Sequence, residues 1–220
     1  MKRWVKIAVD ILMFVLYLYL MGYRPGRSGL YEHGVLGMTL LGLFFLHHIL
    51  NIEWYKSLRK GRYPFLRKLF IAVDFSLLAM MILMALSSMM IAWMIFPVSV
   101  YFPSQVWRTT HVASTAWGFT LMSIHVGLHT HGLFNRLERK AGSWYYVVYA
   151  VLLCIGVFAL SDSGLWGKMI LEIQWQNVED PVLFYVEYLT IVISLCLLTH
   201  LVIKAQSRLA ARGRPPADDR

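Results

Sequence analysis

The sequence predicts an all-α, polytopic membrane protein with six transmembrane helices. Its composition is the first reason, because 58% of its 220 residues are hydrophobic and only 15% are charged. Soluble domains average about 45–50% apolar and about 25% charged residues. The second reason is that the apolar residues fall into six long runs, and the third is that lysine and arginine concentrate in alternate loops. A helix of about 20 apolar residues crosses the hydrocarbon core of a bilayer, so the chain has room for six spans and for no large soluble domain.

Each run is long enough, or nearly so, to cross the membrane as a helix. The runs are Val5–Gly22, Leu30–Asn51, Leu69–Phe96, Val106–His131, Trp144–Leu160 and Leu183–Lys204. Asp10 interrupts the first run and no small-residue cleavage site follows it, so we expect an uncleaved span rather than a signal peptide. The stretch Lys168–Trp175 predicts a short helix on the membrane surface. The tail Arg212–Arg220 has no apolar pattern and predicts disorder.

Charge distribution predicts the orientation. Seventeen of the 21 lysines and arginines lie at the N-terminus, in the loops 52–68 and 132–143, and in the C-terminal tail. The positive-inside rule therefore predicts that both termini are cytoplasmic, and it explains the net charge of +9 without a nucleic-acid partner. The loop 161–181 carries four acids and is expected outside. Cys154 and Cys196 form no CxxCH or CxxC motif, which argues against covalent haem, iron–sulfur clusters and structural zinc.

A tetrapeptide repeat relates the first four runs. Ile7–Asp10 and Ile71–Asp74 share the sequence Ile-Ala-Val-Asp, and each copy opens a helix that precedes a histidine-bearing helix. The first two and the next two spans therefore resemble two copies of one hairpin that point the same way. The second and fourth spans would run parallel.

Four histidines occupy corresponding places on these two parallel spans. His33 and His47 are 14 residues apart, and so are His111 and His125. Fourteen residues turn a helix about 40° short of four full turns and advance about 21 Å, so both members of a pair share one face. His33 would then face His111 near the outer surface, and His47 would face His125 deeper. Each facing pair could supply two axial ligands to a b-type haem, so the histidines are candidate iron ligands.

A histidine in a membrane helix is more often a hydrogen-bonding or proton-relay group than a haem ligand. Eight histidines would give about 0.25 pairs at this spacing by chance. Two pairs in corresponding places of a repeat therefore favour haem ligation.

Three further residues are candidate haem contacts. Gly118 lies midway between His111 and His125, and Gly37 lies one turn after His33; either glycine could provide a flat gap for a porphyrin, or serve ordinary close helix packing. Arg108 could pair with a haem propionate, or reach the interface as a snorkelling cation.

The acids Asp10 and Asp74 lie within the first and third spans. They could orient an axial histidine, but we favour snorkelling or pairing with a basic neighbour. The remaining histidines could exchange protons with a quinone, although interfacial polar positions are favoured. These are His48, His129, His131 and His200.

Because of these two histidine pairs, the segment 1–131 resembles the four-helix di-haem cytochromes b. The local sequence is closer to the flavinylation-associated cytochromes, a bacterial membrane family in which the histidine is followed four residues later by Asn or His, then an aromatic residue. Here His47 is followed by Asn51 and Trp54, and His125 by His129. The resemblance favours His47 over His48 and His125 over His129. Thr130-His131-Gly132 replaces the aromatic residue expected after the second histidine, and the last two spans resemble no family we can name.

The resemblance implies a four-helix haem-binding bundle over residues 1–131, followed by two additional spans over 132–220. It also implies two haem b groups, electron exchange with quinone in a bacterial inner membrane, and an extracytoplasmic flavin- or haem-bearing redox partner. The chain would be a subunit of an oxidoreductase complex rather than a stand-alone enzyme. A ferric-reductase-like haem protein and a non-redox transporter with histidine proton relays remain alternatives.

Overall fold

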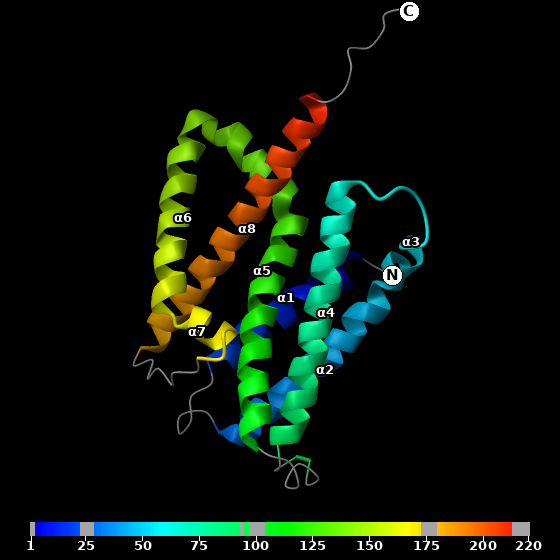
Figure 1. Ribbon diagram of the computed structural model, residues 1–220, viewed down its shortest axis with the longest axis vertical. Helices are drawn as coiled ribbons and strands as arrows, with labels where there is room; N and C mark the ends of the chain where they lie inside the picture. Colours follow the sequence, from blue (N-terminus) through cyan, green and yellow to red (C-terminus); the bar gives the residue numbers. More distant parts are fainter. Residues whose placement is uncertain (1–2, 23–28, 93–94, 97–103, 173–179, 213–220) are drawn as a thin grey trace, which may run out of the picture.

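The computed structural model describes residues 3–22, 29–92, 95–96, 104–172 and 180–212, and every element within these ranges is a helix (Figure 1). The membrane-length helices are α1 (Arg3–Met21), α2 (Leu30–Leu50), α4 (Phe65–Ile91), α5 (Ser104–Ala141), α6 (Tyr145–Asp162) and α8 (Pro181–Arg212). Three short elements lie between them: α3 (Ile52–Ser57), the 3₁₀ turn η2 (Gly142–Trp144) and α7 (Leu165–Met169). The all-α class is therefore confirmed.

Five stretches of the described chain are long and apolar enough to cross a membrane. Four of them are α1, α2, α4 and α8. The other, Gln105–Asp162, contains both α5 and α6, which Figure 1 shows running in opposite directions on either side of a turn. A multi-pass architecture follows from their length and composition.

α5 is longer than its apolar run predicts. It continues for ten residues past His131 and ends at Ala141. Charged residues such as Arg136 and Glu138 end the apolar pattern, but Arg, Glu, Lys and Leu are all good helix formers, so the helix itself continues. It stops where Gly142 adopts a φ of +56°, a backbone conformation that favours glycine.

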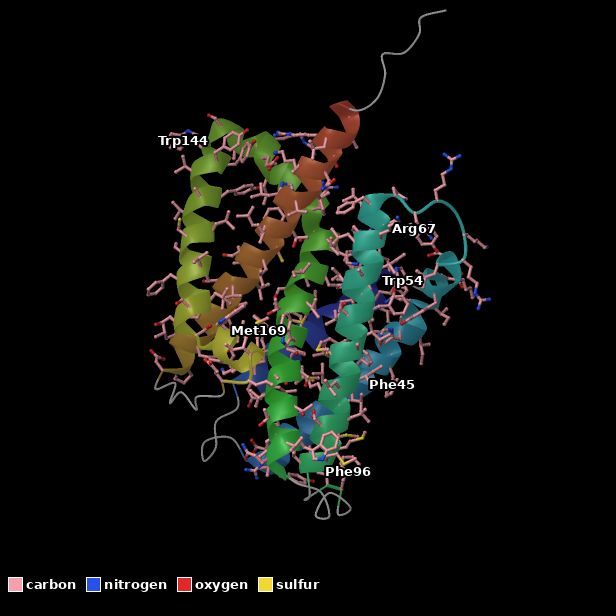
Figure 2. All side chains as sticks on the ribbon, in the orientation of Figure 1. Phe45, Trp54, Arg67, Phe96, Trp144 and Met169 are labelled. Atoms are coloured by element: carbon pink, nitrogen blue, oxygen red, sulfur yellow. The ribbon has the colours of Figure 1, made fainter. Side chains whose placement is uncertain are left out.

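Two short helices also differ from the predictions. α3 forms within a stretch predicted as a loop, and its Trp54 ring lies beside α4 with its centre 5.9 Å from that of Phe75 (Figure 2). α7 covers Leu165–Met169 rather than Lys168–Trp175, and the indole of Trp117 on α5 donates a hydrogen bond to the Met169 carbonyl at 3.0 Å. Residues 173–175 and the predicted disordered tail beyond Arg212 lie outside the described residues.

The helices pack as two hairpins joined to a central C-terminal helix. α1 packs on α2 and α4 packs on α5, while α8 packs on both α5 and α6 (Figure 1). α8 is the most buried of the candidate spans. The second hairpin is therefore supported from behind by α8, a point that matters for the site below.

Small residues allow the close approach of α8 to its neighbours. A Cβ added at Gly127 of α5 would lie 2.8 Å from the Cα of Cys196, and one added at Gly156 of α6 would collide with the side chain of Ser194. The Ser194 hydroxyl donates to the Leu152 carbonyl at 2.9 Å. Glycine and serine at such contacts are typical of membrane helix packing, in which backbones approach closely.

The domain boundary expected at residue 131 falls inside α5. The largest buried cluster contains residues from both hairpins and from α6, α7 and α8, including Tyr17, Phe44, Phe119, Ala159, Leu165 and Tyr188. The helices after residue 131 therefore share a core with the first four long helices.

Candidate functional site

The outer histidine pair meets between α2 and α5. The ring centres of His33 and His111 are 6.2 Å apart and the ring planes are at 82°. Two imidazoles that bind one metal ion through Nε2 at about 2 Å have ring centres about 6 Å apart. The spacing of this pair therefore fits two axial ligands on opposite sides of one iron.

Ser88 of α4 sets the tautomer of His111. The Ser88 hydroxyl donates its single proton to the Met84 carbonyl at 2.8 Å, and its Oγ lies 3.0 Å from Nδ1 of His111. Since that proton is already used, Oγ accepts and Nδ1 of His111 donates. Nε2 then carries a lone pair, which is the form of imidazole that binds a metal.

The inner histidines each bond to an aspartate of the preceding helix. Nδ1 of His47 on α2 lies 2.7 Å from Oδ1 of Asp10 on α1, and Nδ1 of His125 on α5 lies 2.7 Å from Oδ1 of Asp74 on α4. Asp10 and Asp74 are the equivalent positions of the repeat. The two hairpins thus carry the same contact, and the snorkelling role that the sequence favoured for the aspartates is replaced by histidine pairing.

These contacts leave Nε2 of both inner histidines as the candidate ligand atom. A carboxylate accepts the Nδ1 proton and fixes the ring orientation, as happens for most metal-binding histidines. The residues present therefore fit the axial ligand sets of two haem groups. The porphyrin supplies the other four ligands. The described residues contain no group of three or more His, Cys, Asp or Glu arranged to hold a bare metal ion.

The inner pair lies within one electrostatic neighbourhood. His129, one turn after His125, has its ring centre 4.6 Å from that of His125. Asp10 of α1 and Asp74 of α4 both lie near enough to His129 to act on its ring. The structure therefore brings the inner residues of both hairpins together around the inner part of α5.

The two glycines predicted beside the porphyrin have different surroundings. A Cβ added at Gly37 would meet nothing within 4 Å, so the α2 surface is open there. A Cβ added at Gly118 would lie 2.6 Å from the Tyr17 hydroxyl, which itself donates to the Thr115 carbonyl at 2.9 Å. Gly37 thus fits the flat gap, whereas Gly118 makes room for the Tyr17 side chain of α1.

Arg108 lies one turn before His111 and is exposed. At the inner end, Asn51 ends α2: its side chain donates to the His47 carbonyl at 2.9 Å and accepts from Lys6 at 3.2 Å. Arg24 and Arg27, the other outer basic residues, lie outside the described residues.

His48 faces a different environment from His47. Its Nδ1 lies 2.7 Å from the hydroxyl of Tyr55 on α3, and its Nε2 is buried with no hydrogen-bond partner in the part of the chain that the structure describes. Burial and then the charge of Asp74 raise the pKa of Tyr55, so the phenol stays protonated at neutral pH. The prediction that His47 rather than His48 is the ligand agrees with the aspartate contact, which His47 makes.

His131 and His200 form a separate cluster between α5 and α8. Their Nδ1 atoms are 2.9 Å apart, and His200 is fully buried. His200 is therefore covered by neighbouring helices, which the sequence did not predict. An apolar run gives no indication of which of its polar residues a neighbouring helix will cover.

Sequence reasoning missed Ser88 and Tyr17. Both act through contacts between residues far apart in the chain, Ser88 with His111 and Tyr17 with Thr115. The repeat offers no signal for either, because the position that corresponds to Ser88 in the first hairpin is Arg24 and the position that corresponds to Tyr17 in the second is Met81.

Comparison with known proteins finds no matching family model, no matching curated protein and no matching solved structure. The functional argument therefore rests on the geometry of the histidine pairs.

Proposed function

We propose that this protein carries electrons across a membrane through two b-type haem groups. His33 and His111 would bind the outer haem, and His47 and His125 the inner one. The observation that carries the proposal is the doubled arrangement itself: two histidine pairs on α2 and α5, one with a ring spacing of 6.2 Å and the other with an aspartate on each Nδ1.

Each haem, when bound, supplies a one-electron carrier. The chain's own residues hold and orient it. Asp10, Asp74 and Ser88 hold three of the imidazoles in the tautomer that carries its proton on Nδ1 and a lone pair on Nε2. Gly37 leaves the surface of α2 open, and the exposed Arg108 is available to a propionate at the outer end.

The proposal includes a place for the protein in the cell. Six spans would put both termini in the cytoplasm of a bacterium, with the outer histidine pair toward the far side of the inner membrane. Electrons would pass between membrane quinone and an extracytoplasmic flavin- or haem-bearing protein. We assign the chain the role of an electron-transfer subunit in an oxidoreductase complex, which is the role that the resemblance to di-haem cytochromes implies.

The test is the reduced-minus-oxidised visible spectrum of the purified protein, together with its haem content. We expect a low-spin b-type spectrum and two haems per chain. His47→Ala should remove one haem and leave the other, and His33→Ala should remove the other one. His48→Ala and His129→Ala are matched controls on the same helices and should retain both haems.

Two results would contradict the assignment. A colourless protein would favour a transporter with histidine relays over both the electron-transfer protein and the ferric-reductase-like alternative. Unchanged haem content in His47→Ala would show that the pairing is wrong even if the protein binds haem.

A further inference from the structure

A chain of hydrogen bonds crosses the interface of α5 and α8, away from the four candidate ligands. Nδ2 of Asn135 lies 2.9 Å from Nε2 of His131, and Nδ1 of His131 lies 2.9 Å from Nδ1 of His200. Nε2 of His200 lies 2.9 Å from Oε1 of Glu138, whose Oε2 accepts from Lys204 at 2.6 Å. Two rings, one carboxylate and one ammonium thus form one continuous path.

The proton positions along this path follow from the donor and acceptor rules. Glu138, bonded to an ammonium group, is a carboxylate and can only accept, so Nε2 of His200 donates to it. Nδ1 of neutral His200 is then an acceptor, and Nδ1 of His131 must donate. Nε2 of neutral His131 is left as an acceptor, and the Asn135 amide donates to it. Every bond therefore points the same way, from Asn135 toward Glu138.

The middle of the path is its most buried part, since His131 at one end is only partly buried. His200 is completely buried, whereas the side chains of Glu138 and Lys204 are 10% and 20% exposed. Seven residues separate His131 from Glu138 along α5, a rise of about 10 Å. His131 is thus the end of the path nearer His125, about 9 Å away along the helix, and Lys204 is the end nearer the α5–α6 turn.

The surrounding helices add few other titratable groups. From α6, the Tyr145 hydroxyl accepts from Lys204 at 3.4 Å, and the Tyr149 ring meets His200 edge-on at 6.2 Å. Arg208 of α8 bonds Tyr146 at the rim of the cluster. The Tyr149 hydroxyl is buried and has no partner among the described residues, beside the ring of His200. The cluster therefore contains an unsatisfied polar group in addition to its complete chain.

We propose that this chain is a proton path that accepts a proton at Nε2 of His131 and releases one from Glu138. A proton added to His131 forms a new N–H bond at Nε2, where the Asn135 amide must turn its oxygen toward the ring to accept it, and the Nδ1 proton of His131 moves to Nδ1 of His200. The Nε2 proton of His200 then moves to Glu138, which passes a proton to water beside Lys204. One proton enters, one leaves, and both rings end in the opposite tautomer. A second proton can pass the same way only after both rings have returned to their first tautomers.

The class of proton donor rests on the proposed function. Oxidation of a quinol to a quinone releases two electrons and two protons. The electrons would leave by the haem path, and a hydroxyl proton would leave through His131. The path itself stands on the hydrogen bonds above and requires no haem.

The test is the tautomeric state of both rings, measured by nitrogen-15 NMR on purified full-length protein with labelled histidine. At neutral pH we expect His131 protonated on Nδ1 and His200 on Nε2. On acidification both rings should invert together, in one step that coincides with protonation of Glu138 in the infrared spectrum. Glu138→Gln keeps an acceptor oxygen but cannot take the proton, so the joint inversion should disappear. Glu187→Gln makes the same substitution on α8, away from the cluster, and should leave the joint inversion unchanged.

Separate inversion of the two rings, a permanently charged His200, or joint inversion that persists in Glu138→Gln would each overturn the path. Circular dichroism of Glu138→Gln checks that the helices are retained, and His200→Gln, which interrupts the chain at another point, should abolish the inversion of His131 as well. A colourless protein that shows joint inversion would retain the path and refute the haem assignment. A haem-loaded protein without inversion would do the opposite.

Discussion

At the scale of single residues, Asp10 and Asp74 make the same contact in unequal surroundings. Each bonds Nδ1 of a candidate ligand at 2.7 Å, but the Asp10 side chain is 50% exposed and that of Asp74 is 14% exposed. Exposure weakens an ion pair or charged hydrogen bond because solvent screens it and competes for it. The Asp74–His125 contact should therefore be the stronger of the two.

We expect Asp74→Asn to weaken inner haem binding by roughly 10- to 100-fold, the range seen when a partner of a metal-binding histidine is removed. Asp10→Asn should have a smaller effect. Haem retention during dialysis against apomyoglobin measures both. Glu53→Gln, which removes an exposed acid bonded to Lys56, is the control and should retain haem like the parent protein. Equal losses in Asp74→Asn and Asp10→Asn would show that burial does not set the strength of these contacts.

Ser88 offers a matched pair of variants with its neighbour. Ser88→Ala removes the acceptor of the His111 Nδ1 proton, so the ring loses its fixed orientation and the outer haem should show an altered midpoint potential. Ser87 is buried and donates to the Met84 carbonyl at 2.9 Å, whereas the contact with His111 belongs to Ser88, so Ser87→Ala changes packing without touching His111. A spectroelectrochemical titration should show a shift confined to one haem in Ser88→Ala. The same shift in Ser87→Ala would assign it to packing of α4 instead.

Residue roles could be predicted where spacing along one helix carries the information. The 14-residue separations place His33 with His47, and His111 with His125, on shared faces without any tertiary knowledge. The hydrogen bonds of Ser88 and Tyr17 could not be predicted, because each depends on how two helices rotate about their axes, and that rotation depends on packing across the whole bundle.

At the scale of helices, the close approach of α6 to α8 depends on Gly156. A larger side chain there must displace Ser194, and overfilling a packed contact costs roughly 1–3 kcal/mol. We expect Gly156→Leu to lower the thermal unfolding temperature in detergent. Gly132 of α5 is the matched control, because a Cβ there meets nothing within 4 Å, so Gly132→Ala should leave stability unchanged or raise it by up to about 1 kcal/mol. A Gly156→Leu protein as stable as the parent would mean that the two helices separate readily.

Helix existence was predictable and helix ends were not. Apolar runs locate α1, α2, α4, α5, α6 and α8, because burial in lipid requires them. The end of α5 is set by helix propensity and by the positive φ of Gly142, which an apolar pattern does not report. α3 is too short and too polar for either signal, and it is held by contacts such as that of Trp54 with Phe75.

At the scale of the whole molecule, the predicted orientation can be tested by thiol labelling. After Cys154 and Cys196 are replaced by alanine, Ser104→Cys at the start of α5 should react with a membrane-impermeant reagent in intact cells. Lys60→Cys, between α3 and α4, should react only after lysis, because the positive-inside rule places that loop in the cytoplasm. The opposite labelling pattern would invert the orientation and move the outer histidine pair to the cytoplasmic side.

The α5–α8 proton path shows what a sequence leaves open at this scale. His131 and His200 are 69 residues apart, and the sequence places each at the end of an apolar run without relating them. Their contact requires α8 to pack against the face of α5 opposite the hairpin, an arrangement fixed by glycine contacts such as that of Gly127 with Cys196.

α8 packs more extensively on the α4–α5 hairpin than on the α1–α2 hairpin. This difference implies an order of assembly. α5 joins α4, α8 and α7, whereas α2 packs chiefly on α1. The second hairpin, α4–α5, would then be folded and hold its two histidines in place before any cofactor binds. The first hairpin, α1–α2, would pack against it last. In haem-depleted protein, amide hydrogen exchange should accordingly be faster in α2 than in α5. Adding haem should slow exchange in α2 more than in α5. Equal exchange in both helices would indicate that the bundle matures as one unit.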